Sequence, residues 1–407
     1  MKENKNDYDV IIIGGGPAGL FCACNIRKKQ KVLLLEKTER LGKKLLITGN
    51  GQCNLTHTGD IQEFIQFYGN NGRFLYSSFH QYFRSDLIRF FEKRGIRFII
   101  NDRGKYFPES LNSKDILDVL VREAGYKARI LLQTPAVDIK KTDSGFLLSD
   151  GEKIFESKIV IIAAGGMSYP GTGSSGDGYG LAEKFGHKII PPKPGLIPLN
   201  IKRYPFQRLQ GLSFHDMGVT LVQKKKKFHF LGDLLLTDRN FSGPVILHCS
   251  RYAEEGDLLR IHFLKVNSYE EFKLSVLEGK KNGKKLFKNW LKINYHLPAS
   301  LCEETVRILG GEITMGQLSE KQSSAVYHFF NHQDFEITGT DGFHKAMVTV
   351  GGICLKEVNP KTMESKKVPN LFFAGEVLDI DGDTGGYNLQ SAFSTAFTAA
   401  AEINNRL

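Results

Sequence analysis

One short stretch near the N-terminus constrains the fold of this chain more than any other feature. Residues Tyr8–Ile13 form an apolar run typical of a β-strand, the turn GGGPAG follows, and Leu20–Lys28 has the composition of a helix. In such a unit, Gly14 permits a tight turn, Gly16 lets a pyrophosphate approach the backbone, and Gly19 lets helix and strand pack closely. The helix N-terminus adds unpaired N–H groups that bind phosphate. The stretch therefore predicts a dinucleotide-binding α/β fold.

A second apolar run supports this prediction. Lys31–Leu35 reads as a strand and ends in Glu36, which stands 22 residues after Gly14. This is the place at which dinucleotide folds carry a carboxylate that accepts hydrogen bonds from ribose hydroxyls. An acidic residue there also disfavours a 2′-phosphate at the same site.

Two further strands are predicted to end in glycine turns. Lys158–Ala163 is followed by Ala164, Gly165 and Gly166, and Asn370–Ala374 is followed by Gly375 and Glu376. In a doubly wound sheet the carboxyl ends of parallel strands lie at one edge, so these turns should converge on a single extended ligand. Contacts from such distant segments favour FAD over NAD.

Composition indicates a globular protein of two or three structural units, with 407 residues, 41% hydrophobic and 24% charged. The N-terminus has no apolar stretch of signal-peptide length, and nowhere do enough apolar residues run together to cross a membrane. We therefore expect a cytoplasmic protein with no membrane partner. The six cysteines include no C-x-x-C pair and no His/Cys cluster with zinc-ligand spacing, so we expect reduced thiols and no metal site.

The net charge of +11 raises the question of a nucleic-acid partner. Residues 195–345 contain 21 Lys/Arg and 16 Asp/Glu, and the rest of the chain contains 34 and 28, so the excess is dispersed. The runs Lys224–Lys227 and KKNGKK (280–285) are interpreted as solvated turns or helix faces. This pattern disfavours nucleic acid and leaves anionic small molecules open.

Several segments together resemble a bacterial flavoprotein family. In chain order they are GGGPAGL, LGKKLLITGNGQCNLTH, GKYFPES, AAGGMSYPGTGSSGDGYGLAEKFGH, FSGP, VTVGGI and NPKTMESKKVPNLFFAGEVLDIDGDTGGYNLQSAF, between residues 8 and 400. They are similar to the aminoacetone oxidase family of FAD-binding enzymes, which includes bile-acid dehydroxylation reductases. The resemblance implies a discontinuous FAD domain with a doubly wound, glutathione-reductase-like Rossmann fold, an inserted β-barrel-like domain and a small helical cap.

The sequence supports this division. PPKPGLIP (191–198) interrupts the α/β pattern, three strand-like runs follow (Gly218–Val222, Lys227–Leu231 and Leu258–Phe263), and apolar residues have helical spacing from Tyr269 to Phe330. We predict that residues 1–194 and 348–407 form the FAD domain, 195–267 and 333–347 the β-rich insert, and 268–332 the cap.

The resemblance places the loop LLITGNGQCNLTH (45–57) along the flavin, with Lys43 and Lys44 near the phosphates. Its small residues could press backbone against a flat ring while Asn54 and Thr56 supply hydrogen bonds. Cys53 is interpreted as a small packed side chain. The alternative is a thiol that forms an adduct with the flavin or relays electrons.

The closing block is predicted to hold the other end of the flavin. Gly385 and Gly386 precede a helix whose positive N-terminus could stabilise reduced flavin. Glu376 should lie near the ribityl chain or the pyrophosphate. Asp381 and Asp383 either line the site or only form the turn and cap the helix.

Thr134–Val137 is predicted to be a strand whose backbone recognises adenine. The candidate catalytic residues are Tyr387 and Asn388, whereas His57 and His187 are interpreted as structural. The candidate cofactor-binding residues are Gly14, Gly16, Pro17, Ala18, Gly19, Glu36, Lys37, Lys43, Lys44, Thr48, Gly49, Asn50, Gly51, Cys53, Asn54, Ala136, Val137, Ala164, Gly165, Gly166, Gly375, Glu376, Asp383, Gly385, Gly386, Tyr387 and Asn388.

Three hypotheses for function follow. The leading one is an FAD-dependent oxidoreductase that uses NADH or NADPH as a transient co-substrate to reduce an unsaturated small organic or steroid-like molecule by hydride transfer from flavin N5. The second is an amine oxidase that acts on aminoacetone-like substrates and makes hydrogen peroxide. The third is a flavin-containing RNA-binding or tRNA-modifying protein. The physiological substrate and the oligomeric state stay open.

Overall fold

The computed structural model describes residues 7–224 and 226–407. Residues 1–6, at the start of the predicted FAD domain, and Lys225, in the lysine run, lie outside the described residues. The chain forms two compact units, one made of Met1–Gly195 with Gly342–Leu407 and the other of Leu196–Asp341. Each unit is described below by itself.

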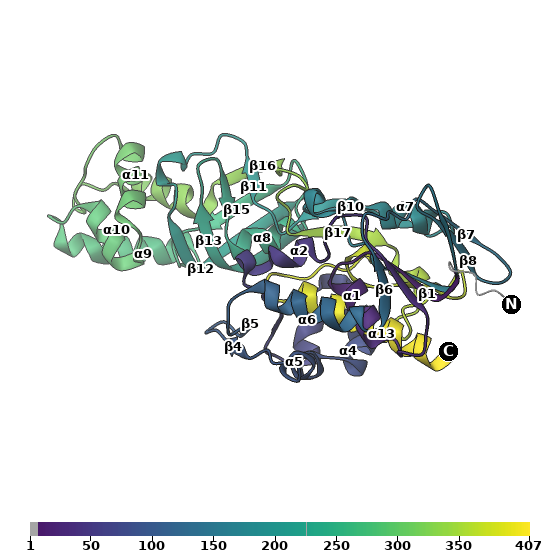
Figure 1. Cartoon of the computed structure of the whole chain (residues 1–407). Coiled ribbons are helices and arrows are strands. Elements are labelled where there is room, and N and C mark those ends of the chain that lie inside the picture. Colours follow the sequence, from purple (N-terminus) through teal and green to yellow (C-terminus); the bar gives the residue numbers. More distant parts are fainter. Residues whose placement is uncertain (1–6, 225) are drawn as a thin grey trace. The chain divides into compact units, whose positions relative to one another are not determined.

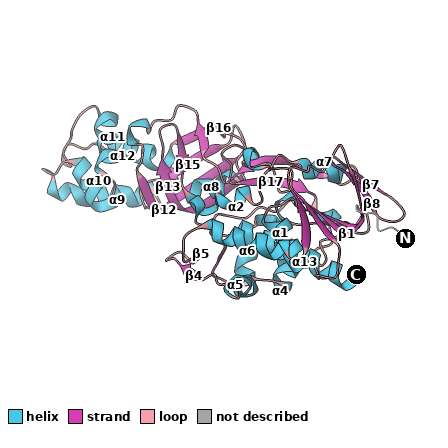
Figure 2. Cartoon of the chain, in the orientation of Figure 1, coloured by secondary structure: helices cyan, strands magenta, loops and turns pink. Residues whose placement is uncertain are grey.

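The first unit is built on a seven-stranded sheet (Figures 1 and 2). Its parallel strands are β1 (Asp7–Ile13), β2 (Val32–Leu35), β6 (Ala128–Leu131), β9 (Ile154–Ile162) and β18 (Leu371–Phe373), and its antiparallel strands are β7 (Asp138–Lys141) and β8 (Phe146–Ser149). The order is β6-β2-β1-β9-β8-β7, and β18 pairs with the second half of β9. β1, β2 and the end of β9 are almost continuously buried, which explains their unbroken apolar sequence. The predicted doubly wound sheet is confirmed.

Three helices pack side by side in this unit: α1 (Pro17–Asn25), α6 (Ser113–Gly125) and α13 (Tyr387–Arg406) (Figure 1). Two cysteines of α1 lie in the contacts, because Cys22 Sγ is 3.5 Å from the Ala396 carbonyl and Cys24 Sγ is 3.5 Å from the Leu120 carbonyl. Helix α1 ends earlier than predicted, since Ile26 has an extended conformation. The small side chains of α1 and α13 allow this close approach.

Shorter elements complete the first unit. The helices and helical turns are α2 (Lys43–Leu46), η1 (Thr48–Gly51), α3 (Ile61–Gln66), η2 (Gly69–Leu75), α4 (Tyr76–Gln81), α5 (Arg84–Glu92), η3 (Pro170–Thr172), α7 (Asp177–Glu183), η7 (Leu355–Glu357) and η8 (Gly375–Val377). β3 (Thr56–His57), β5 (Lys105–Pro108) and β4 (Phe98–Ile100) form a small sheet, and β10 (Ile189–Gly195) pairs with β17 (Val348–Ile353). The β10–β17 pair joins the two chain stretches of this unit.

The second unit contains a closed antiparallel barrel, as the fold prediction expected. Its strands, in barrel order, are β11 (Leu199–Ile201), β14 (Asn240–Ser242), β13 (Lys226–Leu236), β12 (Ser213–Gln223), β15 (Leu258–His262) and β16 (Asp334–Gly339). The remaining elements are η4 (Gln207–Leu209), α8 (Pro244–Ser250), α9 (Tyr269–Gly279), η5 (Lys280–Asn282), α10 (Phe287–Tyr295), α11 (Ala299–Leu309), α12 (Glu320–Tyr327) and the π-helical turn His328–His332. Barrel and helices share one apolar core, so the five-segment division stays a proposal.

One predicted strand is wrong. Residues Thr134–Val137 form an irregular connection between β6 and β7. Pro135 has no N–H to donate, and Gln133, the residue before this segment, has a φ of 51°. The Thr134 N–H donates to Glu36 O (2.9 Å) and the Val137 N–H donates to Ser149 O (2.8 Å), so the segment bonds to two different neighbours instead of to one strand.

Among the described residues, no helix combines the length and the apolar character needed to cross a membrane.

Candidate functional site

The glycine turn after β1 combines tight packing with one open position. A Cβ on Gly14, whose φ is 108°, would lie 2.5 Å from Ala163 O, and a Cβ on Gly19 would lie 1.9 Å from Gly14 O. Both distances are far below van der Waals contact, so both positions require glycine. A Cβ on Gly16 would meet no atom within 4 Å. Gly16 therefore leaves space at the helix N-terminus instead of filling it.

This open position lines a cavity that is open to solvent. The sequence-predicted residues that line it are Gly14, Gly16, Pro17, Ala18, Glu36, Lys43, Lys44, Thr48, Ala164, Gly165, Glu376 and Asn388. The turns after β1, β9 and β18 thus converge at one edge of the sheet, as the sequence predicted.

The acidic end of β2 is held in place by backbone donors. Glu36 Oε2 accepts a hydrogen bond from the Gly15 N–H (2.8 Å), and Oε1 accepts one from the Thr38 N–H (2.8 Å). Glu36 also borders a second, smaller hollow that contains Lys37 and Ala136. Val137, the other residue proposed for adenine, is 55% exposed and lines neither space.

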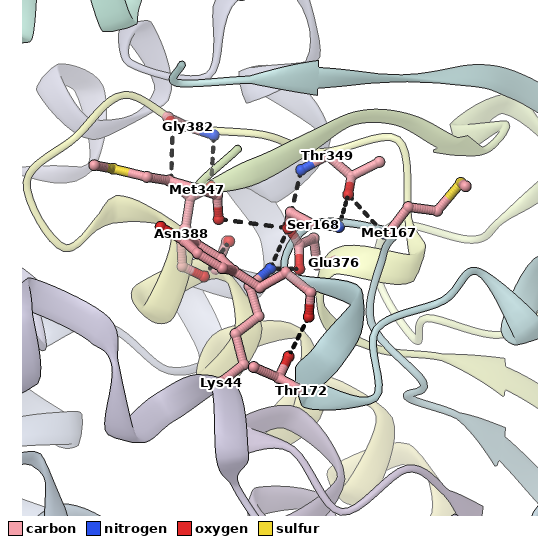
Figure 3. A network of polar contacts seen from close by, with 11 residues as sticks. Lys44, Met167, Ser168, Thr172, Met347, Thr349, Glu376, Gly382 and Asn388 are labelled. Carbon is pink, nitrogen blue, oxygen red and sulfur yellow. Dashed lines mark hydrogen bonds and ion pairs between the residues drawn. The ribbon is translucent and has the colours of Figure 1, made fainter. Parts of the chain in front are cut away.

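A polar network joins four distant segments beside the cavity, and in Figure 3 Lys44, Ser168 and Glu376 point toward one another. Glu376 Oε2 lies 2.7 Å from Lys44 Nζ, and Oε1 accepts hydrogen bonds from Ser168 Oγ (3.2 Å) and from the Thr349 N–H (3.0 Å). Lys44 also contacts Ser168. Thr349 Oγ1 accepts hydrogen bonds from the N–H groups of Met167 (2.7 Å) and Ser168 (3.0 Å).

This network fixes the rim that Lys44 and Glu376 form. Both side chains are about one-fifth exposed, so the charge pair is partly shielded from water yet still reaches the cavity. Because its partners hold it on several sides, Glu376 can orient a polar group of a bound ligand without large rearrangement.

The first two turns of α13 line the same cavity through Asn388, Leu389, Ser391 and Ala392. The Asn388 amide is already engaged, since Nδ2 donates to Gly382 O (2.8 Å) and Oδ1 accepts from the Gly382 N–H (2.8 Å) (Figure 3). Asn388 therefore holds the preceding turn with both ends of its amide. The 20-residue helix presents its positive N-terminal end to the cavity.

Tyr387 was proposed as a catalytic residue, which requires it to lie on the cavity, and it does not. It is 2% exposed and does not line the cavity. Its ring packs on Phe67 (centroids 4.2 Å apart), Phe64 (4.9 Å) and His57 (5.3 Å). Burial raises its phenol pKa above the usual range. It is the first residue of α13, and the structure places it in an aromatic core.

The loop 48–54 touches the cavity through Thr48 alone among its proposed residues. Gly49 and Asn50 are left-handed, and Cys53 is fully buried with a φ of 59°. Burial raises the pKa of the Cys53 thiol to about 12, which disfavours a thiolate and supports the packing interpretation.

The other predicted residues off the cavity have packing tasks. With its amide in the orientation that satisfies both groups, Asn54 donates to Thr56 O and accepts from the Gly386 N–H, each at 3.2 Å. A Cβ on Gly166 would lie 2.4 Å from Thr349 Oγ1, and one on Gly375 would lie 2.8 Å from Ala18 Cβ. Gly51, Asp383 and Gly385 also lie off the cavity lining.

Sequence reasoning missed part of the cavity wall: Arg40, Gly42, Leu45, Ala163, Met347, Val348, Ile380, Leu389, Ser391 and Ala392. The wall also includes Thr172, Gly173 and Ser174, which belong to the tract Ser168–Gly180; its resemblance to a segment of fumarate-reductase-like flavoproteins predicts that it covers the flavin or borders the substrate. Arg40 carried no local signal, because nothing in its neighbours indicated the direction of its side chain.

The residues fit an elongated dinucleotide. An open glycine position stands at a helix N-terminus, a carboxylate ends β2, and a second helix N-terminus lies on the same cavity. Fold and cavity together define a Rossmann-type flavoprotein. No group of His, Cys, Asp or Glu side chains in the described part of the chain could hold a metal ion.

The family model described as "HI0933-like protein Rossmann domain" matches residues 8–402. The chain belongs to this family and is an FAD-dependent oxidoreductase, which confirms the resemblance inferred from its motifs.

Two relatives are named ribosomal RNA dihydrouridine synthase, from Escherichia coli and from Haemophilus influenzae. Each is 32% identical to this chain, and each alignment covers 97% of it and 98% of the relative. A third relative, the 3-dehydro-bile acid delta(4,6)-reductase of Clostridium scindens, is 29% identical with the same coverage.

The solved structures with a similar fold include a 3-ketosteroid-delta4-(5alpha)-dehydrogenase from Rhodococcus jostii. Its TM-score is 0.52 at 14% identity, with 99% of this chain and 98% of that chain covered. A flavocytochrome c3 fumarate reductase has a TM-score of 0.51 at 16% identity, with 99% and 78% covered. At these identities the likeness concerns the fold alone.

Proposed function

We propose that this protein reduces a carbon–carbon double bond conjugated to a carbonyl group, and that its substrate is uridine within ribosomal RNA. The observation that carries the proposal is the shared chemistry in the names of the relatives. Dihydrouridine is uridine with its ring double bond hydrogenated, and a bile-acid delta(4,6)-reductase hydrogenates ring double bonds. The leading sequence-based hypothesis, reduction of an unsaturated substrate, belongs to this class.

RNA is preferred over a steroid because two relatives with 32% identity over nearly their whole length carry the RNA name. A net charge of +11 is also compatible with a polyanionic substrate. The dispersed charge disfavoured nucleic acid and left anionic small molecules open, so the support for RNA comes mainly from the relatives. A steroid-like substrate is the second candidate, supported by the 29% identity to the bile-acid enzyme.

Bound FAD would supply the hydride-transfer chemistry, with NADH or NADPH as the proposed reductant. The chain's own residues bind and orient the cofactor. Gly16 would leave room for the pyrophosphate, and Glu36 would accept hydrogen bonds from ribose hydroxyls. Lys44 and Glu376 fix the rim, and the α13 N-terminus favours negative charge in the cavity.

The test is an anaerobic reduction with the FAD-loaded protein. Ribosomal RNA from a strain that lacks this gene is incubated with the protein and NADH or NADPH, and its nucleosides are analysed by mass spectrometry. A parallel reaction contains a 3-oxo-4,6-diene steroid, and an aerobic one contains aminoacetone with a peroxide assay. Protein stripped of flavin is the control.

New dihydrouridine in the RNA reaction supports the proposal. Hydrogenation of the steroid without formation of dihydrouridine would show that the second candidate, a steroid-like substrate, is correct. Peroxide formation without any double-bond reduction would replace the proposal with the amine oxidase hypothesis.

A further inference from the structure

A cluster of imidazole and cationic side chains covers one outer face of the barrel. Strand register defines it: Thr220 on β12 lies between His229 on β13 and Arg260 on β15, and Gly218 on β12 pairs with His262 on β15. The π-helical turn adds His328 and His332 beside β15. We call Lys227, His229, Arg260, His262, His328 and His332 the imidazole face.

Four of the 11 histidines of the chain thus gather on one face, in contrast to the dispersed charge of the sequence. Lys227, His229, His328 and His332 are exposed, and Leu231, next to His229 on the same side of β13, is 72% exposed. His328 and His332 lie almost parallel, with ring planes 13° apart. The face offers flat rings and an apolar side chain to solvent.

Thr220 fixes two of these rings. Its Oγ1 lies 3.0 Å from His229 Nδ1 and 2.9 Å from His262 Nε2. A hydroxyl has one proton, so Thr220 donates to one ring at most and the other ring donates to it. Within the described residues, nothing pairs with His229 Nε2 or His262 Nδ1, so both nitrogens stay available to a ligand.

The acidic residues near the face are already neutralised. Asp334 forms a two-point ion pair with Arg260 (2.8 and 2.9 Å), and Glu336 is paired with Lys202 (2.8 and 3.0 Å). Lys227 has no acidic partner in the part of the chain that the structure describes. Burial and the Arg260 charge lower the pKa values of His262 and His332, and Asp334 only partly opposes this for His332. Among the described residues, the face therefore keeps the uncompensated positive charge of Lys227, while the lowered pKa values favour neutral, hydrogen-bonding rings at His262 and His332.

We propose that the imidazole face binds single-stranded RNA, with Lys227 and the histidine N–H groups on phosphates and with bases against the exposed rings and Leu231. Cationic grooves interleaved with flat side chains are the general solution for unpaired nucleic acid, and His is among the residues on which RNA bases stack. This inference rests on the proposed function, in which RNA is the substrate.

The test compares two variants with the same numbers of lysine and histidine changes. The face variant is Lys227→Gln, His332→Gln, and the control is Lys280→Gln, His296→Gln, whose changes lie on and between the helices of the same unit. Binding of the FAD-loaded full-length proteins to protein-free ribosomal RNA is measured over a series of salt concentrations. The flavin spectrum and thermal unfolding check that the variants fold.

We expect the face variant to bind at least tenfold more weakly than the parent, whereas the control binds like the parent. The slope of log affinity against log salt should fall by about 0.7, because one lysine leaves a single-stranded phosphate. If the parent binds RNA and the face variant binds equally well, the inference is overturned while the proposed function stands. If the parent neither binds RNA nor forms dihydrouridine, both are overturned.

Discussion

At the scale of single residues, the glycine turn separates packing from ligand binding. Gly14, Gly16 and Gly19 look alike in the motif, yet their surroundings differ. Gly19 is pressed against the Gly14 carbonyl, whereas the space beside Gly16 is empty and Gly16 has an ordinary φ of −80°. At Gly19 the requirement for glycine comes from contacts within the protein. At Gly16 such a requirement can come only from a bound ligand.

We therefore expect Gly16→Ala to leave the stability of the flavin-free protein within about 0.5 kcal/mol and to weaken FAD binding at least tenfold. Gly19→Ala should destabilise the flavin-free protein by about 2 kcal/mol or more, because the new methyl group meets a carbonyl oxygen. Urea unfolding and FAD titration of the stripped proteins measure both. Equal FAD affinity in Gly16→Ala and parent would mean that the cofactor does not approach this turn.

At the scale of elements, helix α13 is anchored at its start by the loop that precedes β3. Gly386 has a φ of 95°, and a Cβ there would lie 2.7 Å from backbone atoms of Thr56. The Gly386 N–H donates to the Asn54 side chain. The loop 45–57 therefore supports the cavity indirectly, by fixing the direction of the helix end.

Substituting Gly386→Val should destabilise the first unit by about 1–3 kcal/mol, since the change forces a strained φ and a backbone clash. It should also lower the flavin reduction potential or release FAD, because the helix end moves away from the cavity. Unfolding curves and spectroelectrochemical titration test this. Gly125→Ala, at the end of α6 where a Cβ meets nothing within 4 Å, is the control. An unchanged potential with full FAD occupancy would contradict the proposed role of the helix end.

At the scale of the whole molecule, the first unit is closed by contacts between its two chain stretches. His187 belongs to the first stretch and is 3% exposed. Its Nε2 lies 2.7 Å from Ser365 Oγ in the second stretch, and its Nδ1 lies 3.2 Å from Glu357 Oε2 without hydrogen-bond geometry. Burial lowers the His187 pKa, and the Glu357 charge opposes this only in part.

The unfolded chain therefore takes up a proton at His187 near pH 6.5 while the folded protein does not. The contribution to stability is complete above about pH 6.5 and is lost as pH falls, by at most about 1.4 kcal/mol per pH unit. Urea unfolding of the parent at about pH 7.5 and about pH 5.5 should show a larger loss than that of His187→Gln. Identical losses in both proteins would show that His187 stays protonated or has a normal pKa in the folded state.

Local sequence was sufficient for the features that depend on neighbours along the chain. The β1–turn–α1 unit, the acid at the end of β2 and the glycine turns after β9 and β18 lie where the apolar runs and glycines predicted, as do the longer barrel strands. Buried strands and glycine turns impose their requirements on consecutive residues, so a single sequence records them.

Tertiary structure alone decided which side chains meet. Tyr387 and Asn388 are adjacent in sequence, yet one lies in an aromatic core and the other on the cavity, because successive helical residues point to different faces. The partners of Glu376 come from three distant segments, and the imidazole face exists only because strand register brings Thr220 between His229 and His262. Helix orientation and strand register depend on the packing free energy of many contacts between residues far apart in the sequence. A local sequence pattern does not report those contacts.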